Sequence, residues 1–225
     1  MLIYMGKLAS DVIVMYVSTM TVSEGLRADG LLDMSRGERT RSAILDASRR
    51  LFLERGFRGT PINAITEACG ISRAGFYTYF KDKREVFNVL GETAYHDVLG
   101  VIAHCHDAAA SGRPDALMAW VGEYFDYMDR HGAFVTAAAH TAPDDDAFRR
   151  SRNHMMTRAA WRLGEAISAN GRHSPEVIGV AAMGLLDRGW YAVQTQSVPV
   201  DRTEVIAVIA ETITAMAATP DETRT

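Results

Sequence analysis

Apolar residues return every three or four positions along most of the chain from residue 36 onward, which is the spacing of one face of an α-helix. This pattern predicts helices over about 38–55, 83–105, 115–131, 133–140, 146–170, 174–196 and 202–218, with two shorter helices between residues 60 and 80. The predicted helices end at glycines such as Gly56 and begin at capping residues such as Asp82 and Asp201. We therefore predict an all-α fold.

The two short helices are joined closely enough to form a helix-turn-helix. We expect Thr60 to cap the first of them, with Pro61 at its first helical position, where a missing N–H has no cost. Gly70 then adopts a positive φ that ends this helix, and Ser72 caps the second. A connection of about four residues is typical of a helix-turn-helix.

The second short helix has one apolar side and one exposed side. Phe76 and Phe80 lie four residues apart and point inward. The opposite surface, which can enter a major groove, carries Arg73, Ala74, Gly75, Tyr77 and Thr78. The fork of Arg73 suits the O6 and N7 atoms of guanine, although an arginine just after a cap can equally bind a phosphate. Asn63 on the first short helix reaches either a phosphate or a base edge.

The same stretch resembles the DNA-binding domain of the TetR family of bacterial repressors. The resemblance covers residues from about 36 to 90, and it is carried by Gly70, Ile71, Ser72, Phe76, Tyr77, Phe80 and Lys83. It implies that Tyr77, Tyr79 and Lys83 contact the DNA backbone and that Thr60 and Ser72 add a phosphate contact to their capping roles. The chain departs from the family at Gly75, where threonine or serine is common. The segment GISRAGFYTYF is also similar to the actinobacterial branch that includes the ethionamide-resistance repressor.

The last two predicted helices are expected to form a dimer. The helix over 174–196 has two apolar rows, so one row faces the core and the other needs a second partner. The resemblance implies that the last two helices of each subunit form a four-helix interface. The expected interface residues are Met183, Leu186, Trp190, Val205, Ile209, Ile213 and Met216. The alternative is that both rows belong to the core of a monomer.

A pocket for a small molecule is the third site that the resemblance implies, although no shared motif marks its residues. Large, adaptable side chains gather on the later helices: Trp120, Tyr124, Phe125, Met128, Met155, Trp161, Met183 and Trp190. Such residues line apolar pockets, and they equally form ordinary cores. Trp161 falls off the main apolar stripe of its helix, which suggests a pocket or dimer contact there. The expected ligand is a small apolar inducer.

Charge is unevenly distributed along the chain. The net charge is −4, yet residues 36–89 hold 11 Lys and Arg against 6 Asp and Glu, which leaves 13 against 22 elsewhere. The basic charge therefore lies with the helix-turn-helix. Two cysteines give no disulfide framework, which favours a reduced, cytoplasmic protein. We expect a DNA-binding domain over 36–82, a ligand-binding and dimerisation domain over 83–219, and a tail over 220–225.

Residues 1–35 fit neither domain. Lys7 and Asp11 interrupt their apolar run, so neither a membrane span nor a signal peptide is expected. The segment is predicted to be a mobile arm, or an over-long gene start with Met20 or Met34 as the true beginning.

Other functional classes have weaker support in the sequence. It has no nucleophile elbow, phosphate-binding loop or dinucleotide fingerprint, so no catalytic residue and no cofactor are expected. A metal-sensing regulator would use His140 or His154 with the aspartates at 144–146. A helical protein-interaction module, in which the helix-turn-helix only packs, is the other alternative. The expected function is a repressor that binds a palindromic operator as a homodimer and is released by its inducer.

Overall fold

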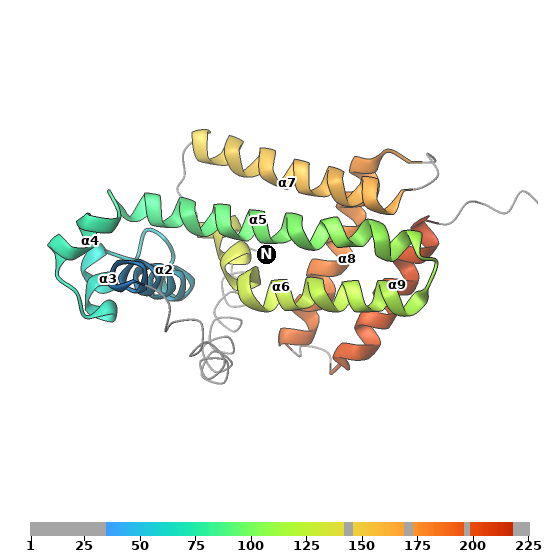
Figure 1. Ribbon diagram of the computed structural model, residues 1–225, viewed down its shortest axis with the longest axis horizontal. Helices are drawn as coiled ribbons and strands as arrows, with labels where there is room; N and C mark the ends of the chain where they lie inside the picture. The colour runs from blue at the N-terminus through green and yellow to red at the C-terminus, as the bar shows by residue number, and fades with distance from the viewer. Residues whose placement is uncertain (1–34, 142–145, 169–172, 196–198, 218–225) are drawn as a thin grey trace, which may run out of the picture. The chain divides into compact units, whose positions relative to one another are not determined.

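The computed structural model describes residues 35–141, 146–168, 173–195 and 199–217, and all of their regular secondary structure is helical. The predicted all-α fold is therefore confirmed over these residues. The helices, labelled in Figure 1, are α2 (Arg36–Arg55), α3 (Ile62–Cys69), α4 (Arg73–Tyr79), α5 (Lys83–Ala110), α6 (Pro114–Thr141), α7 (Asp146–Ile167), α8 (Pro175–Thr195) and α9 (Arg202–Ala217). Residues 1–34 of the predicted arm and the whole predicted tail over 220–225 lie outside the described residues.

The starts of α5 and α9 follow the predicted capping chemistry. At α5, the Glu85 backbone N–H donates to Asp82 Oδ1 at 2.9 Å, and the Glu85 carboxylate accepts from the Lys81 backbone N–H. At α9, the Glu204 N–H donates to Asp201 Oδ1 at 3.0 Å. These bonds satisfy donors that have no partner within the helix, which is why short-range spacing locates helix starts well.

Helix α6 runs through the position where the sequence predicted a break. We expected one helix to close at Gly132 and a short helix to follow, but the structure has one continuous helix of 28 residues. A glycine inside a helix costs only about 1 kcal/mol relative to alanine. Beyond it, Phe134 is buried and its ring lies 5.0 Å from that of Phe87, between centroids. Burial of this side chain is large enough to offset the cost of the glycine.

The chain divides into two compact units. The first holds residues up to Ala94 together with 131–145, and the second holds 95–130 and everything from 146 onward. In the first unit, α2, α3 and α4 pack together with the start of α5 (Figure 1). The second unit is built on a continuous apolar core from α5, α6, α7, α8 and α9. Helices α5 and α6 each contribute to both units.

Within the second unit, α7 and α8 are in backbone contact at two glycines. A Cβ atom added at Gly164 would lie 1.7 Å from the carbonyl oxygen of Pro175, and one at Gly179 would lie 1.7 Å from that of Ala160. No side chain fits at either position. These two glycines therefore set how closely α7 packs on α8.

The structure corrects the predicted dimer residues. Four of them are almost completely buried inside a single chain, with exposures of 0% for Leu186, 1% for Trp190, 5% for Ile209 and 0% for Ile213, and Met183 is buried as well. Val205 and Met216 are half-buried against the same core. Because a partner cannot reach a side chain that its own chain already covers, the five buried residues are core, whereas Val205 and Met216 stay predictions. The other row of α8 is the exposed one.

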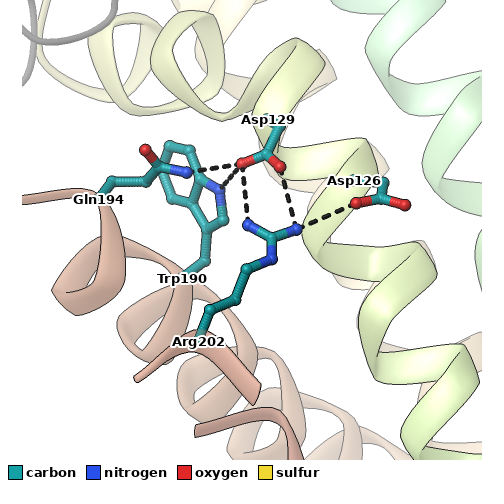
Figure 2. Close-up of polar contacts among 5 residues, drawn as sticks. All are labelled: Asp126, Asp129, Trp190, Gln194 and Arg202. Carbon is teal, nitrogen blue, oxygen red and sulfur yellow. Dashed lines mark hydrogen bonds and ion pairs between the residues drawn. The ribbon is translucent and has the colours of Figure 1, made fainter. Parts of the chain in front are cut away.

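Figure 2 shows a polar cluster that joins three helices of the second unit. Asp129 on α6 accepts a hydrogen bond from Trp190 Nε1 at 2.7 Å and another from Gln194 Nε2 at 2.6 Å, both on α8. The NH2 group of Arg202, at the start of α9, lies 3.0 Å from Asp129 Oδ2 and 3.0 Å from Asp126 Oδ1. The charge-assisted bonds at one half-buried carboxylate hold α6, α8 and α9 together.

Asp129→Ala should therefore lower the free energy of unfolding by about 1–3 kcal/mol, because it leaves the Trp190 N–H without its acceptor. Asp126→Ala is the matched control: its side chain is 73% exposed and makes one ion pair with Arg202, so about 0–1 kcal/mol is expected. Urea unfolding followed by circular dichroism measures both. Equal losses in the two variants would contradict the central role of Asp129.

Candidate nucleic-acid interface

The turn between α3 and α4 has the geometry of a helix-turn-helix. Gly70 adopts φ 64° and ψ 32°, and the Ile71 N–H donates to the Thr66 carbonyl at 3.0 Å. The Ser72 hydroxyl accepts from the Gly75 N–H at 3.0 Å and so caps α4. The predicted left-handed turn at Gly70 and the cap at Ser72 are both confirmed. Three residues join the two helices.

Two aromatic side chains fix the orientation of α4. Phe76 is 0% exposed and Phe80 is 2% exposed, and their ring centroids are 6.0 Å apart. Arg41 on α2 places its guanidinium carbon 5.0 Å from the centroid of the Phe80 ring. With these two side chains buried, the opposite side of α4 faces solvent, as the spacing predicted.

An exposed polar surface results, which we call the reading face. It consists of Asn63 from α3 together with Ser72, Arg73, Ala74, Tyr77 and Thr78. Arg73 is its centre: its NH1 group donates to Asn63 Oδ1 at 3.3 Å, and its NH2 group donates to the Tyr77 hydroxyl at 3.3 Å. The guanidinium carbon also lies 5.8 Å from the Tyr77 ring centroid. Sequence spacing suggests the Arg73–Tyr77 contact, because residues four apart meet on a helix, but it gives no signal for the contact across the turn to Asn63.

The structure corrects the predicted role of Thr60. Its side chain is 0% exposed, and its hydroxyl bonds to the carbonyl oxygens of Leu51 at 3.0 Å and Gly56 at 2.8 Å. The N-cap of α3 is Pro61, with no side-chain capping bond. Thr60 therefore fastens the end of α2 to the loop that follows it. A buried hydroxyl cannot add a phosphate contact.

Lys83 is placed differently from its expected role as a phosphate contact. Its ammonium group donates to the carbonyl oxygens of Phe57 at 2.7 Å and Thr60 at 3.0 Å, and lies 4.6 Å from the Phe57 ring centroid. Partial burial lowers the pKa of Lys83. Two of its three N–H donors hold the loop between α2 and α3, which leaves one for DNA.

The remaining predicted contacts lie around the reading face. Tyr79 is half-buried, and a Cβ atom added at Gly37 on α2 would lie 3.8 Å from its hydroxyl oxygen. The Thr78 hydroxyl donates to the Ala74 carbonyl at 3.2 Å, one turn back in the same helix. A Cβ atom at Gly75 would lie 3.4 Å from Ser72 Oγ, which is an ordinary van der Waals contact, so the space beside the cap does not require glycine there.

The predicted ligand-pocket residues lie in or around the core of the second unit. Six are buried, namely Trp120, Tyr124, Phe125, Met128, Met183 and Trp190. The Trp120 N–H donates to the Val101 carbonyl at 2.8 Å, and the Tyr124 hydroxyl donates to Asp187 Oδ1 at 2.8 Å. Burial raises the pKa of both Tyr124 and Asp187. Met155 is half-buried and Trp161 is 37% exposed, so Trp161 does lie outside the core.

Metal and membrane chemistry find no support in the described part of the chain. Among the described side chains, no group of three or more His, Cys, Asp or Glu is placed to hold a metal ion. The expected metal-sensing alternative also used Asp144, which lies outside the described residues. No described helix combines the length and the apolar character needed to cross a membrane.

The helix-turn-helix also matches known proteins. Residues 44–90 match the model of bacterial regulatory proteins of the tetR family. This segment is therefore a DNA-binding domain of the TetR family. It is 34% identical over 61 residues to the transcriptional regulator AcrR of Shigella flexneri, covering 27% of this chain and 28% of AcrR. It is 37% identical over 51 residues to the transcriptional repressor AcnR of Corynebacterium efficiens, covering 23% of this chain and 27% of AcnR. The chain thus spans under a third of these TetR relatives, so the match concerns the DNA-binding domain.

Solved structures extend the likeness to the whole fold. A transcriptional regulator from Aquifex aeolicus aligns with a TM-score of 0.58 at 16% identity, over 79% of this chain and 99% of that one. The fatty acid degradation regulator FadR of Bacillus halodurans aligns with a TM-score of 0.60 at 15% identity, over 78% and 94%. At such low identity these likenesses concern the fold alone. They show that the TetR fold continues beyond the DNA-binding domain.

Lys83→Met should lower the free energy of unfolding by about 1–3 kcal/mol, because it leaves the Phe57 and Thr60 carbonyls without their donor. Lys81→Met at an exposed position is the matched control and should change it by less than about 0.5 kcal/mol. Guanidinium unfolding measures the free energy of unfolding of both variants. An unchanged stability of Lys83→Met would return this side chain to its expected role as a phosphate contact.

Proposed function

We propose that this chain is a transcriptional repressor that binds a palindromic operator as a homodimer and is released by a small apolar molecule. The observation that carries the proposal is the reading face, where Arg73 stands exposed on a short helix anchored by two buried phenylalanines. The excess of basic residues over 36–89 supplies the charge for the DNA backbone. Repression is supported by relatives such as AcnR and by NalD of Pseudomonas aeruginosa, a secondary repressor of a multidrug efflux pump.

The exposed row of α8 is the proposed dimer surface. It carries Val177 and Val180, which are 60% and 65% exposed, with Ala181 and Gly184 on the same side. Val208 on α9 is 57% exposed. Small side chains let two helices approach closely, and valines in contact with water gain free energy when a partner covers them. A second copy of the chain is the proposed partner.

Release by a ligand requires two states with different affinities for DNA. Ligand can shift such an equilibrium only by its differential affinity, and the coupling is typically worth about 1–3 kcal/mol. The pocket is proposed in the second unit, among the aromatic and methionine side chains of α6, α7 and α8. We further propose that the protein works in the cytoplasm and has no catalytic activity, in keeping with relatives that are regulators of transcription.

The DNA-binding proposal predicts a specific loss in one variant. Arg73→Ala should weaken binding to an operator duplex by about 5–150 fold. This factor corresponds to the loss of about 1–3 kcal/mol that is typical of a base contact. Arg150→Ala removes the same charge from an exposed position of α7 and should have little effect. Mobility shift on the protein's own upstream DNA measures both. Failure to retard any duplex would favour a protein-interaction module in which the helix-turn-helix only packs.

The dimer proposal predicts that Val180→Glu gives a folded monomer. A charge placed without a partner in an apolar seam costs several kcal/mol, whereas at an exposed position of a free chain it costs little. Met156→Glu puts the same charge at a 42% exposed position of α7 and should leave the dimer intact. Sedimentation velocity reports the mass. A Val180→Glu dimer as stable as wild type would mean that the interface lies elsewhere.

A further inference from the structure

Three side chains of the reading face form a hydrogen-bonded set that crosses the turn of the helix-turn-helix. Asn63 belongs to α3, whereas Arg73 and Tyr77 belong to the first and second turns of α4. Both bonds to the guanidinium are 3.3 Å long and come from different nitrogens, NH1 to Asn63 and NH2 to Tyr77. The Tyr77 ring supports the guanidinium further. The arginine is thus held at both ends of its fork although all three residues are exposed.

We propose that Asn63 and Tyr77 are positioning residues, which hold Arg73 so that it reads a guanine in each half of the operator. This inference rests on the proposed function and adds the base that is read. Arg73 has five N–H donors and uses two within the protein, so three remain. A guanine needs two of them, one for O6 and one for N7.

The chemistry of the two acceptors fits this role. An amide oxygen and a phenol oxygen are both neutral, so they orient the guanidinium without cancelling the charge that attracts it to DNA. Arginine has about 2 kcal/mol of rotamer freedom, and a side chain that is already held loses less of it on binding. A planar fork fixed in one orientation matters for an in-plane contact with a base edge. A phosphate is bound well by an unoriented point charge.

The same bonds limit what the two neighbours can read. Bidentate recognition of adenine by an asparagine needs its amide oxygen to accept from adenine N6. The Asn63 oxygen uses one of its two lone pairs on Arg73, so its amide is turned toward the arginine, while its NH2 group is free to donate. The Tyr77 hydroxyl likewise accepts from Arg73 and keeps its own proton. Both residues can therefore donate to a phosphate, while sequence is read through Arg73.

The test starts from the duplex that wild-type protein selects out of a random palindromic library. Each guanine is replaced in turn by 7-deazaguanine, which lacks the N7 acceptor and still pairs with cytosine. Wild type should lose affinity at one guanine per half-site, by about fivefold or more. Arg73→Ala should bind more weakly and should not distinguish guanine from 7-deazaguanine at that position. This forms a double-mutant cycle between one side chain and one atom.

The positioning residues are tested in the same cycle. Asn63→Ala and Tyr77→Phe keep Arg73. In wild type the affinity ratio between the guanine and 7-deazaguanine duplexes is expected to be about fivefold or more, and each variant should lower this ratio by about threefold or more. Their salt dependence should equal that of wild type, because neither variant removes a charge. Asn88→Ala, at an exposed position of α5, is the matched control and should keep full discrimination.

Two results would overturn the inference while leaving DNA binding intact. One is an enriched duplex at which no 7-deazaguanine affects wild type. The other is an equal loss on the guanine and 7-deazaguanine duplexes for Asn63→Ala and Tyr77→Phe, since direct backbone contacts would give that pattern. A selection that enriches no sequence would overturn the proposed function itself and the inference with it.

Discussion

The reading face depends on how a helix of only seven residues is held in place. An isolated helix as short as α4 is unstable in water, since nucleation costs more than two turns return. Burial of Phe76 and Phe80 provides about 1.5–3 kcal/mol each, and the Ser72 cap adds about 1 kcal/mol. Because two phenylalanines four residues apart fix both the tilt and the rotation of α4, they also decide that Arg73 and Tyr77 face solvent. The proposed reading of a base by Arg73 thus depends on apolar packing on the other side of the helix.

Polar contacts then join neighbouring elements within each unit. In the first unit, Lys83 holds two carbonyl groups of the loop between α2 and α3, and so ties the start of α5 to the helix-turn-helix. In the second unit, Asp129 accepts hydrogen bonds from α8 and pairs with Arg202 of α9. It lies close to residue 131, where α6 passes into the first unit. Both arrangements use a charged group with several partners, which is stronger than an isolated surface ion pair.

Most local chemistry was predictable from the sequence, and long-range placement was not. The cap expected at Thr60 was wrong, because its hydroxyl bonds back to the Leu51 and Gly56 carbonyls. Gly70, Ser72 and the cap at Asp82 act within four residues, so spacing alone located them. Lys83 reaches carbonyl groups 23 and 26 residues away, and nothing in its neighbourhood signals this. The two apolar rows of α8 were visible as well, but periodicity cannot say which row faces its own chain. The predicted end of a helix at Gly132 was wrong for a related reason, since the burial of Phe134 that favours a continuous α6 is a tertiary effect.

The most direct test of the account is hydrogen exchange of the full chain with and without its selected duplex, read by mass spectrometry of peptides. The account predicts that DNA slows exchange most strongly in peptides covering 62–80, because contacts of α3 and α4 with DNA suppress local opening there. Arg73→Ala should greatly reduce that protection at equal DNA concentration. Protection confined to the basic helix α7, with residues 62–80 unchanged, would contradict the placement of the DNA-binding surface on α3 and α4.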